Sequence, residues 1–138
     1  MDVLQAAILN YRFTKLASTI DTRRKNANFY MNHLNQEFVF FLPEQSWEYN
    51  TYHTFVIQVD KRDKLNRALA ESGIETAIHY PVPIHLQPAA RKFGYNLGDF
   101  PVTERQSKCI LTLPIHQFLT EADLERITSA INTFYQNS

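Results

Sequence analysis

Two histidines, a tyrosine and three prolines gather in residues 73–88, which read GIETAIHYPVPIHLQP. The prolines fix φ at their own positions and remove backbone donors, and the residues before them are held extended. This segment, called the arch below, is therefore stiff and non-repetitive. A rigid loop that carries imidazole and phenol groups suits a binding site better than a spacer. Its candidate hydrogen-bonding side chains are those of His79, Tyr80, His85 and Gln87.

Spacing alone leaves the role of the arch open, because a proline-rich surface crossover has the same composition and a short motif without structural context is weak evidence. A metal site is not indicated, since His79, His85 and His116 would have to converge and the spacing of the first two is not typical of metal ligands. Cys109 lies in an apolar run without an activating neighbour, which favours a small core residue over a nucleophile. The chain has no phosphate-binding glycine motif. Composition and spacing by themselves predict no catalytic residue.

Length and charge limit the class of protein. The 138 residues fit one domain with its own core. The 14 basic residues balance the 14 acidic ones, which predicts no general attraction to nucleic acid or to an anionic membrane. A single cysteine allows no intramolecular disulfide and indicates a reducing compartment, so we expect a cytoplasmic protein without a signal peptide. The longest apolar run, at residues 38–42, is too short to span a bilayer.

Apolar residues at helical spacing predict helices over about residues 2–20 and 21–34, either separate or joined as one long, bent helix. Asp2 and Gln5 form a variant of the capping box at its start. Such a helix is longer than a chain of this size needs for its own core. Its apolar face has no preceding segment to cover it, so we expect an exposed patch through which copies of the chain associate. The candidates for this patch are Leu4, Ile8 and Tyr11.

Four apolar or alternating runs predict strands, at residues 38–42, 52–59, 74–80 and 109–113. Helices are expected at residues 61–72, 88–93 and 102–108, and a last one begins after Thr120, which forms a capping box with Asp123. Asp60 is the expected N-cap of the helix at 61–72, and Gly73 is its C′ residue. We expect Trp47 to pack over the sheet with its indole N–H bonded. The order of elements predicts an α+β fold, a small, mostly antiparallel sheet with helices packed on one face.

Six segments, taken together and in order, resemble one known family. They are MDVLQAAIL at 1–9, YHTFVI at 52–57, GIETAIHYP at 73–81, PIHLQP at 83–88, GDFPVTE at 98–104 and LTLP at 111–114. This pattern resembles the DegT/DnrJ/EryC1/StrS aminotransferases, which are PLP-dependent sugar aminotransferases with the fold of aspartate aminotransferase. The match runs through nearly the whole chain, and the His-Tyr-Pro…His-Leu-Gln-Pro block is specific to the family.

The resemblance covers only the C-terminal part of such enzymes. It implies an interdomain-type helical segment at residues 1–35 and the C-terminal small domain of a fold-type I aminotransferase at residues 36–138. In the family, a large N-terminal domain comes first and carries PLP on a lysine. None of the six lysines of this chain lies in a setting like that of the PLP lysine. The resemblance therefore implies a fragment that needs the N-terminal domain as its partner, and that neither holds PLP covalently nor transaminates alone.

By the resemblance, the arch acts as a lid on the substrate side and faces a nucleotide-linked keto-sugar, with no catalytic residue and no metal ligand of its own. Tyr80, His85 and His79 would border the sugar and hydrogen-bond to it, although a core histidine is an equally good interpretation of His79. A lid role predicts that Tyr80 and His85 are partly exposed. A structural role predicts a buried His85 with its nitrogens paired. The family also implies a dimer with sites near the subunit interface.

A second class of function is a stand-alone module that binds a nucleotide sugar or a protein without catalysis. A gene that reads through an upstream lysine segment would favour the aminotransferase, and a ribosome-binding site before the first codon would favour the module. The sequence does not name the sugar, the amino donor or the pathway, and it leaves open whether Met1 is a native start.

Overall fold

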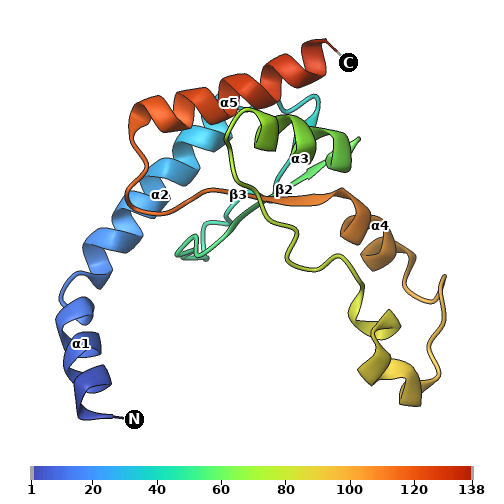
Figure 1. Ribbon diagram of the computed structural model, residues 1–138, viewed down its shortest axis with the longest axis horizontal. Helices are drawn as coiled ribbons and strands as arrows, with labels where there is room; N and C mark the ends of the chain where they lie inside the picture. The colour runs from blue at the N-terminus through green and yellow to red at the C-terminus, as the bar shows by residue number, and fades with distance from the viewer. Residues whose placement is uncertain (1, 138) are drawn as a thin grey trace.

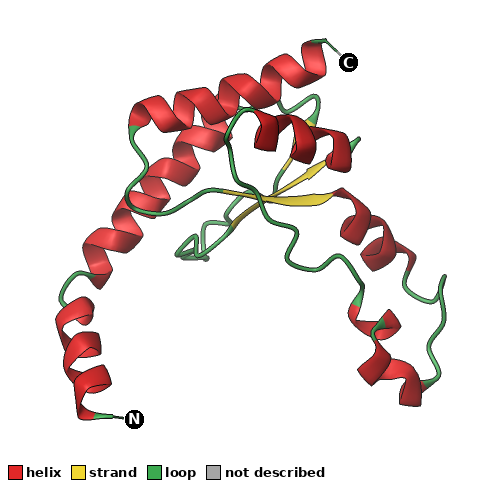
Figure 2. Ribbon diagram, in the orientation of Figure 1, coloured by secondary structure: helices red, strands yellow, loops and turns green. Residues whose placement is uncertain are grey.

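A computed structural model describes residues 2–137 of the chain (Figure 1). Helices lie together on one side of a small sheet, and two arms extend from this body on the other side, at opposite ends (Figures 1 and 2). One arm is the N-terminal helix. The other arm is formed by residues 81–109, which we call the distal lobe.

The elements confirm the predicted α+β fold. In chain order they are α1 (Val3–Phe13), α2 (Leu16–His33), β1 (Val39–Phe40), β2 (Phe55–Val59), α3 (Arg62–Glu71), the short 3-10 helices η1 (Ile84–Leu86) and η2 (Pro88–Phe93), α4 (Pro101–Cys109), β3 (Ile110–Leu113) and α5 (Glu121–Gln136). The last helix begins with the predicted capping box of Thr120 and Asp123.

The sheet is antiparallel throughout, in the order β1-β2-β3. Phe55 of β2 pairs with Leu113 of β3. Along β2, successive side chains point to opposite faces, so that Phe55, Ile57 and Val59 are buried while Val56 is 41% exposed. One face of the sheet therefore forms the core, and the other face is open.

The core lies between the covered face of the sheet and helices α2, α3 and α5. Its largest fully buried side chains include Tyr30, Ile57, Leu65, Leu69, Leu111 and Ile131. The phenol of Tyr30 donates a hydrogen bond to the carbonyl of Pro114 at 2.7 Å, and burial raises its pKa, so the hydroxyl stays protonated. Within the described part of the chain, the core includes no residue from 79 to 110. Other contacts must therefore hold the distal lobe together.

The predicted N-terminal helix consists of two parts, α1 and α2, with a break at Thr14 and Lys15. The hydroxyl of Thr14 donates to the carbonyl of Tyr11 at 2.7 Å, a local bond that competes with the helical pattern. The predicted capping box of Asp2 and Gln5 is confirmed. Helix α1 has no buried residue, and the side chains expected to form its apolar patch are all exposed: Leu4, Ile8 and Tyr11.

The sequence predicts the C-terminal end of α3 correctly and its N-cap wrongly. Asp60 is not the N-cap: Lys61 takes that position with φ +54 and makes no side-chain cap bond. The other end is confirmed, since Gly73 has φ +71. Its N–H bonds back to the carbonyl of Ala70, and the N–H of the next residue bonds back to Leu69. This pattern closes a helix at a left-handed residue.

The predicted strand at residues 74–80 is wrong, because the arch makes only one bridge to the sheet. Ala77 donates its N–H to the carbonyl of Thr112 at 3.1 Å and accepts the N–H of Thr112 at 2.8 Å. A longer ladder would need backbone donors that the following prolines lack. Strand β3 begins at Ile110 rather than at Cys109, which ends α4 and is half-buried.

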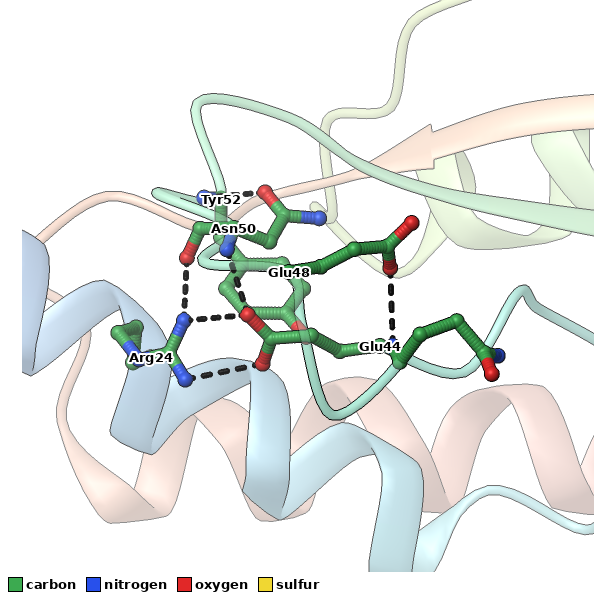
Figure 3. A network of polar contacts seen from close by, with 6 residues as sticks. Arg24, Glu44, Glu48, Asn50 and Tyr52 are labelled. Atoms are coloured by element: carbon green, nitrogen blue, oxygen red, sulfur yellow. Dashed lines mark hydrogen bonds and ion pairs between the residues drawn. The ribbon is translucent and has the colours of Figure 1, made fainter.

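An ion pair fixes the loop between β1 and β2 to helix α2 (Figure 3). Arg24 donates from both terminal nitrogens to the carboxylate of Glu44, at 2.8 and 2.9 Å, and also to the carbonyl of Asn50 at 2.6 Å. The hydrogen bond from Arg24 is the main reason that the pKa of Glu44 is lowered. The loop exposes 80% of Trp47, so the expected packing of this side chain over the sheet is wrong.

Gly73→Ala tests how the end of α3 depends on glycine. We expect it to lower the free energy of unfolding by about 1–2 kcal/mol, because a Cβ is unfavourable at positive φ. The new Cβ would also lie 3.1 Å from Nη2 of Arg126. The matched control is Gly94→Ala, since Gly94 has φ +75 but no atom within 4 Å of an added Cβ. Urea unfolding should show a larger loss of unfolding free energy for Gly73→Ala than for Gly94→Ala. An unchanged urea midpoint for Gly73→Ala would contradict the role of Gly73 as the left-handed residue that ends α3.

Candidate functional site

The arch is attached to the sheet at its foot. The Nδ1 atom of His79 lies 2.8 Å from the hydroxyl oxygen of Thr112 in β3. Thr112 is buried, but His79 is exposed, so His79 is not the core histidine of the alternative interpretation. The sheet therefore holds one nitrogen of a surface imidazole.

Tyr80, the next residue of the arch, is 64% exposed. Within residues 2–137, no hydrogen bond holds its hydroxyl. The partial exposure expected of this side chain is confirmed, and its hydroxyl is available to a group outside the described chain.

His85 lies on η1 in the distal lobe, and its side chain is only 8% exposed. Its Nε2 atom lies 3.0 Å from Oε1 of Glu104 on α4. Its ring also contacts that of Phe100, with the ring centroids 4.8 Å apart. The lid role predicted a partly exposed His85, and that expectation is wrong for the side chain. A buried ring with Nε2 paired inside the fold is what the structural role predicted, because a buried imidazole needs such a partner.

Glu104 is the centre of the polar contacts of the distal lobe. The oxygen that contacts His85 also accepts hydrogen bonds from the N–H groups of Gly98, at 2.8 Å, and Phe100, at 3.4 Å. Burial of the Glu104 carboxyl by itself disfavours the charged form. The bonds from Gly98, His85 and Phe100 outweigh this effect and lower the pKa of Glu104. One ionised carboxylate thus joins η1, the loop before α4, and α4 itself.

Two partners of the arch, Glu104 and Thr112, were not identified from the sequence. A signal for Glu104 was present, because it lies in the first turn of a helix that begins with Pro101. From there a carboxylate can reach the N–H groups that precede the helix. No local signal marks Thr112, because its place opposite the arch depends on the pairing of distant segments.

Two cavities border the arch. One, of about 610 Å³, follows residues 73–77, the end of β3 and the start of α5, and its polar lining includes Glu75, His116, Asp123 and Arg126. The other, of about 490 Å³, lies in the distal lobe beside His85. Its walls are mainly apolar and include Ile84, Phe93, Tyr95 and Phe100.

The described residues offer few means to hold a metal or a covalent cofactor. Between residues 2 and 137, no three His, Cys, Asp or Glu side chains are grouped so as to hold a metal ion. Among these described residues, none of the helices has the length and apolar character needed to cross a bilayer. All six lysines are exposed, and none lines either cavity. The residues present therefore do not fit a site that holds PLP on an enclosed lysine.

Solved structures define the class of protein to which this fold belongs. S. venezuelae DesV has a TM-score of 0.92 and 30% identity to the chain, over 97% of the chain and 36% of DesV. A DegT DnrJ EryC1 StrS aminotransferase from Brucella abortus has a TM-score of 0.90 and 30% identity, with the same two coverages. The fold is that of an aminotransferase domain.

Residues 1–132 match the DegT/DnrJ/EryC1/StrS aminotransferase family, and the chain belongs to this family. It is 35% identical, over 99% of its length, to the pleiotropic regulatory protein of Geobacillus stearothermophilus. It is 31% identical, over 97% of its length, to the dTDP-3-amino-3,6-dideoxy-alpha-D-galactopyranose transaminase of Aneurinibacillus thermoaerophilus. The chain spans 38% and 36% of these two relatives. The family that the resemblance implied is therefore confirmed. The chain corresponds to little more than a third of the length of these relatives.

Glu104→Gln should destabilise the chain in a pH-dependent way. The folded state lowers the pKa of Glu104 below its ordinary value of 4.5. The charged form therefore contributes stability above that value, and this contribution is lost as the pH falls through the lower, folded pKa. Thermal melts from neutral pH downward should show a lower Tm for Glu104→Gln at neutral pH and a gap that closes in acid. The control is Glu75→Gln, at an exposed position. If the Glu104→Gln variant and the parent chain have the same Tm at neutral pH, or if their difference in Tm stays constant into acid, this role of the carboxylate is contradicted.

Proposed function

We propose that residues 36–138 form the small domain on the substrate side of a PLP-dependent aminotransferase that acts on a nucleotide-linked keto-sugar. Residues 1–35 would connect this domain to the rest of the enzyme. The observation that carries the proposal is the family match over residues 1–132. In this proposal the arch is a lid over the sugar, and Tyr80, His79 and His85 are its hydrogen-bonding residues.

The names of two relatives support the substrate class. One is the dTDP-linked sugar transaminase of A. thermoaerophilus. The other, 36% identical over 95% of this chain, is the UDP-N-acetyl-3-dehydro-alpha-D-glucosamine 3-aminotransferase of Acidithiobacillus ferrooxidans. Both names contain a sugar linked to a nucleoside diphosphate. The exposed groups of Tyr80 and His79 can donate and accept the hydrogen bonds that sugar hydroxyls make.

The cofactor would be held by the N-terminal part of the complete enzyme. PLP supplies the electron sink for amino-group transfer when it is bound. Because the six lysines of this chain are exposed and lie outside both cavities, we place the PLP lysine in that N-terminal part. The chain described here would therefore not transaminate by itself.

Uncovered apolar surface supports the need for a further domain. Exposed apolar side chains occur on α1, on the open face of the sheet and on the distal lobe, with Leu4, Val56 and Phe93 as examples. Helix α1 and the distal lobe extend on the side of the sheet away from α3 and α5 (Figure 1). A stand-alone binding module would leave all of this surface in water, which is unusual for a monomeric soluble protein. An N-terminal domain between the two arms would cover it.

A hybrid enzyme tests the lid role. In it, this chain replaces the matching C-terminal part of the A. thermoaerophilus transaminase. We expect Tyr80→Phe in the hybrid to raise KM for the dTDP-sugar about 2- to 10-fold, the cost of one neutral hydrogen bond. The value of kcat should change little, because the contact would be to the substrate and not to the cofactor. Tyr49→Phe is the control, at an exposed tyrosine outside the arch. An unchanged KM in an active Tyr80→Phe hybrid would contradict the lid role.

The isolated chain should show no specific covalent attachment of PLP. We expect borohydride reduction after incubation with PLP, followed by mass spectrometry, to reveal only low labelling scattered over several lysines. Exposed amines react weakly with any aldehyde, whereas a PLP lysine is activated by its surroundings. Stoichiometric labelling of a single lysine would show that this chain holds the cofactor itself.

A further inference from the structure

The contact between Glu104 and His85 selects one tautomer of the histidine. An ionised carboxylate can only accept hydrogen bonds. Because Oε1 of Glu104 lies 3.0 Å from Nε2 of His85, this nitrogen must carry the hydrogen. The other nitrogen of the neutral ring, Nδ1, is then an acceptor without a hydrogen.

The Nδ1 atom of His85 belongs to a side chain that is only 8% exposed and that lines the cavity of about 490 Å³. It has no hydrogen-bond partner within residues 2–137. In that part of the chain, the one fully enclosed side-chain oxygen or nitrogen without a partner is the hydroxyl of Tyr52. Nδ1 is not one of these enclosed atoms, so it keeps some contact with the surroundings of the ring, and the cavity of about 490 Å³ lies beside that ring.

The distal lobe offers little else to hold the imidazole in place. The main core does not extend into the lobe. The ring of Phe100 lies against His85, and the ring of Tyr95 lies against Phe100, with centroids 5.1 Å apart. Glu104 also accepts the N–H of Phe100, so this carboxylate holds both the imidazole and the backbone of its aromatic neighbour.

We propose that Glu104 is a positioning residue, which holds the Nε2–H of His85 so that Nδ1 is presented as an acceptor for a hydroxyl group of the nucleotide sugar. The proposal rests on the proposed function, because it requires that the arch face the substrate. It assigns to Glu104 an effect on substrate binding that acts through His85 and not through direct contact.

The tautomer can be measured in the chain itself by two-bond ¹H–¹⁵N correlation spectra of the histidine rings. At about pH 8, where an ordinary imidazole is neutral, we expect His85 to carry its hydrogen on Nε2. Glu104→Ala removes the acceptor and should give a mixture of both tautomers, whereas Glu104→Gln keeps an oxygen there and should restore the Nε2–H form. The matched control is Asp99→Ala, since the Asp99 carboxylate bonds to Asn96 in the same lobe and not to His85.

Two results of this measurement would overturn the proposal. One is an Nδ1–H tautomer in the parent chain, which can be detected even if Glu104→Ala does not fold. The other is a folded Glu104→Ala variant in which the tautomer of His85 is unchanged.

Kinetics of the hybrid enzyme separate this proposal from the proposed function. If Glu104 acts through His85, then Glu104→Ala and His85→Ala each raise KM for the dTDP-sugar, and the double variant raises it no further. Additive effects of the two changes would overturn the positioning role and leave the lid role intact. A normal KM in His85→Ala would overturn the substrate contact of His85, whatever the tautomer.

Discussion

The carboxylate of Glu104 is the contact on which the shape of the distal lobe depends. The lobe lies outside the hydrophobic core, so its segments are not fixed by the burial that fixes the sheet and its helices. One oxygen of Glu104 instead gathers a side chain from η1 and two backbone N–H groups from the loop before α4. A buried carboxylate is stable only when such donors surround it. This carboxylate therefore ties together segments of the lobe that the hydrophobic core does not reach.

The rest of the chain has one closed side and one open side. Helices α2, α3 and α5 cover one face of the sheet, and the residues between them form a complete core. The opposite side carries α1, the open face of the sheet and the distal lobe, which contains the second half of the arch (Figure 2). The surfaces proposed to meet substrate and the N-terminal domain are all on this open side. Stability and function are thus assigned to different sides of the same small sheet.

Local signals in the sequence predicted the elements that local contacts determine. The alternation in β2, the glycine that ends α3 and the capping boxes of α1 and α5 are all confirmed. One error is local, since Lys61 and not Asp60 is the N-cap of α3. The other errors concern how segments pack against the rest of the fold. The strand expected at residues 74–80 is reduced to one bridge, and the prolines that follow cannot extend the ladder. Trp47 lies in solvent, on the loop that Arg24 and Glu44 tie to α2. The pairing of His85 with Glu104 also joins segments whose meeting no periodicity reveals.

The most direct test of the central claim, that the arch meets the nucleotide sugar, is a ¹H–¹⁵N NMR titration of this chain with UDP-N-acetylglucosamine at millimolar concentration. The account predicts saturable shifts of the amides of Tyr80 and His85 and of their neighbours in the distal lobe. The amides of α3 and of the C-terminal half of α5 should not move. Saturable shifts confined to the cavity beside Glu75 and Arg126, or no saturable shift at Tyr80 and His85, would contradict the claim.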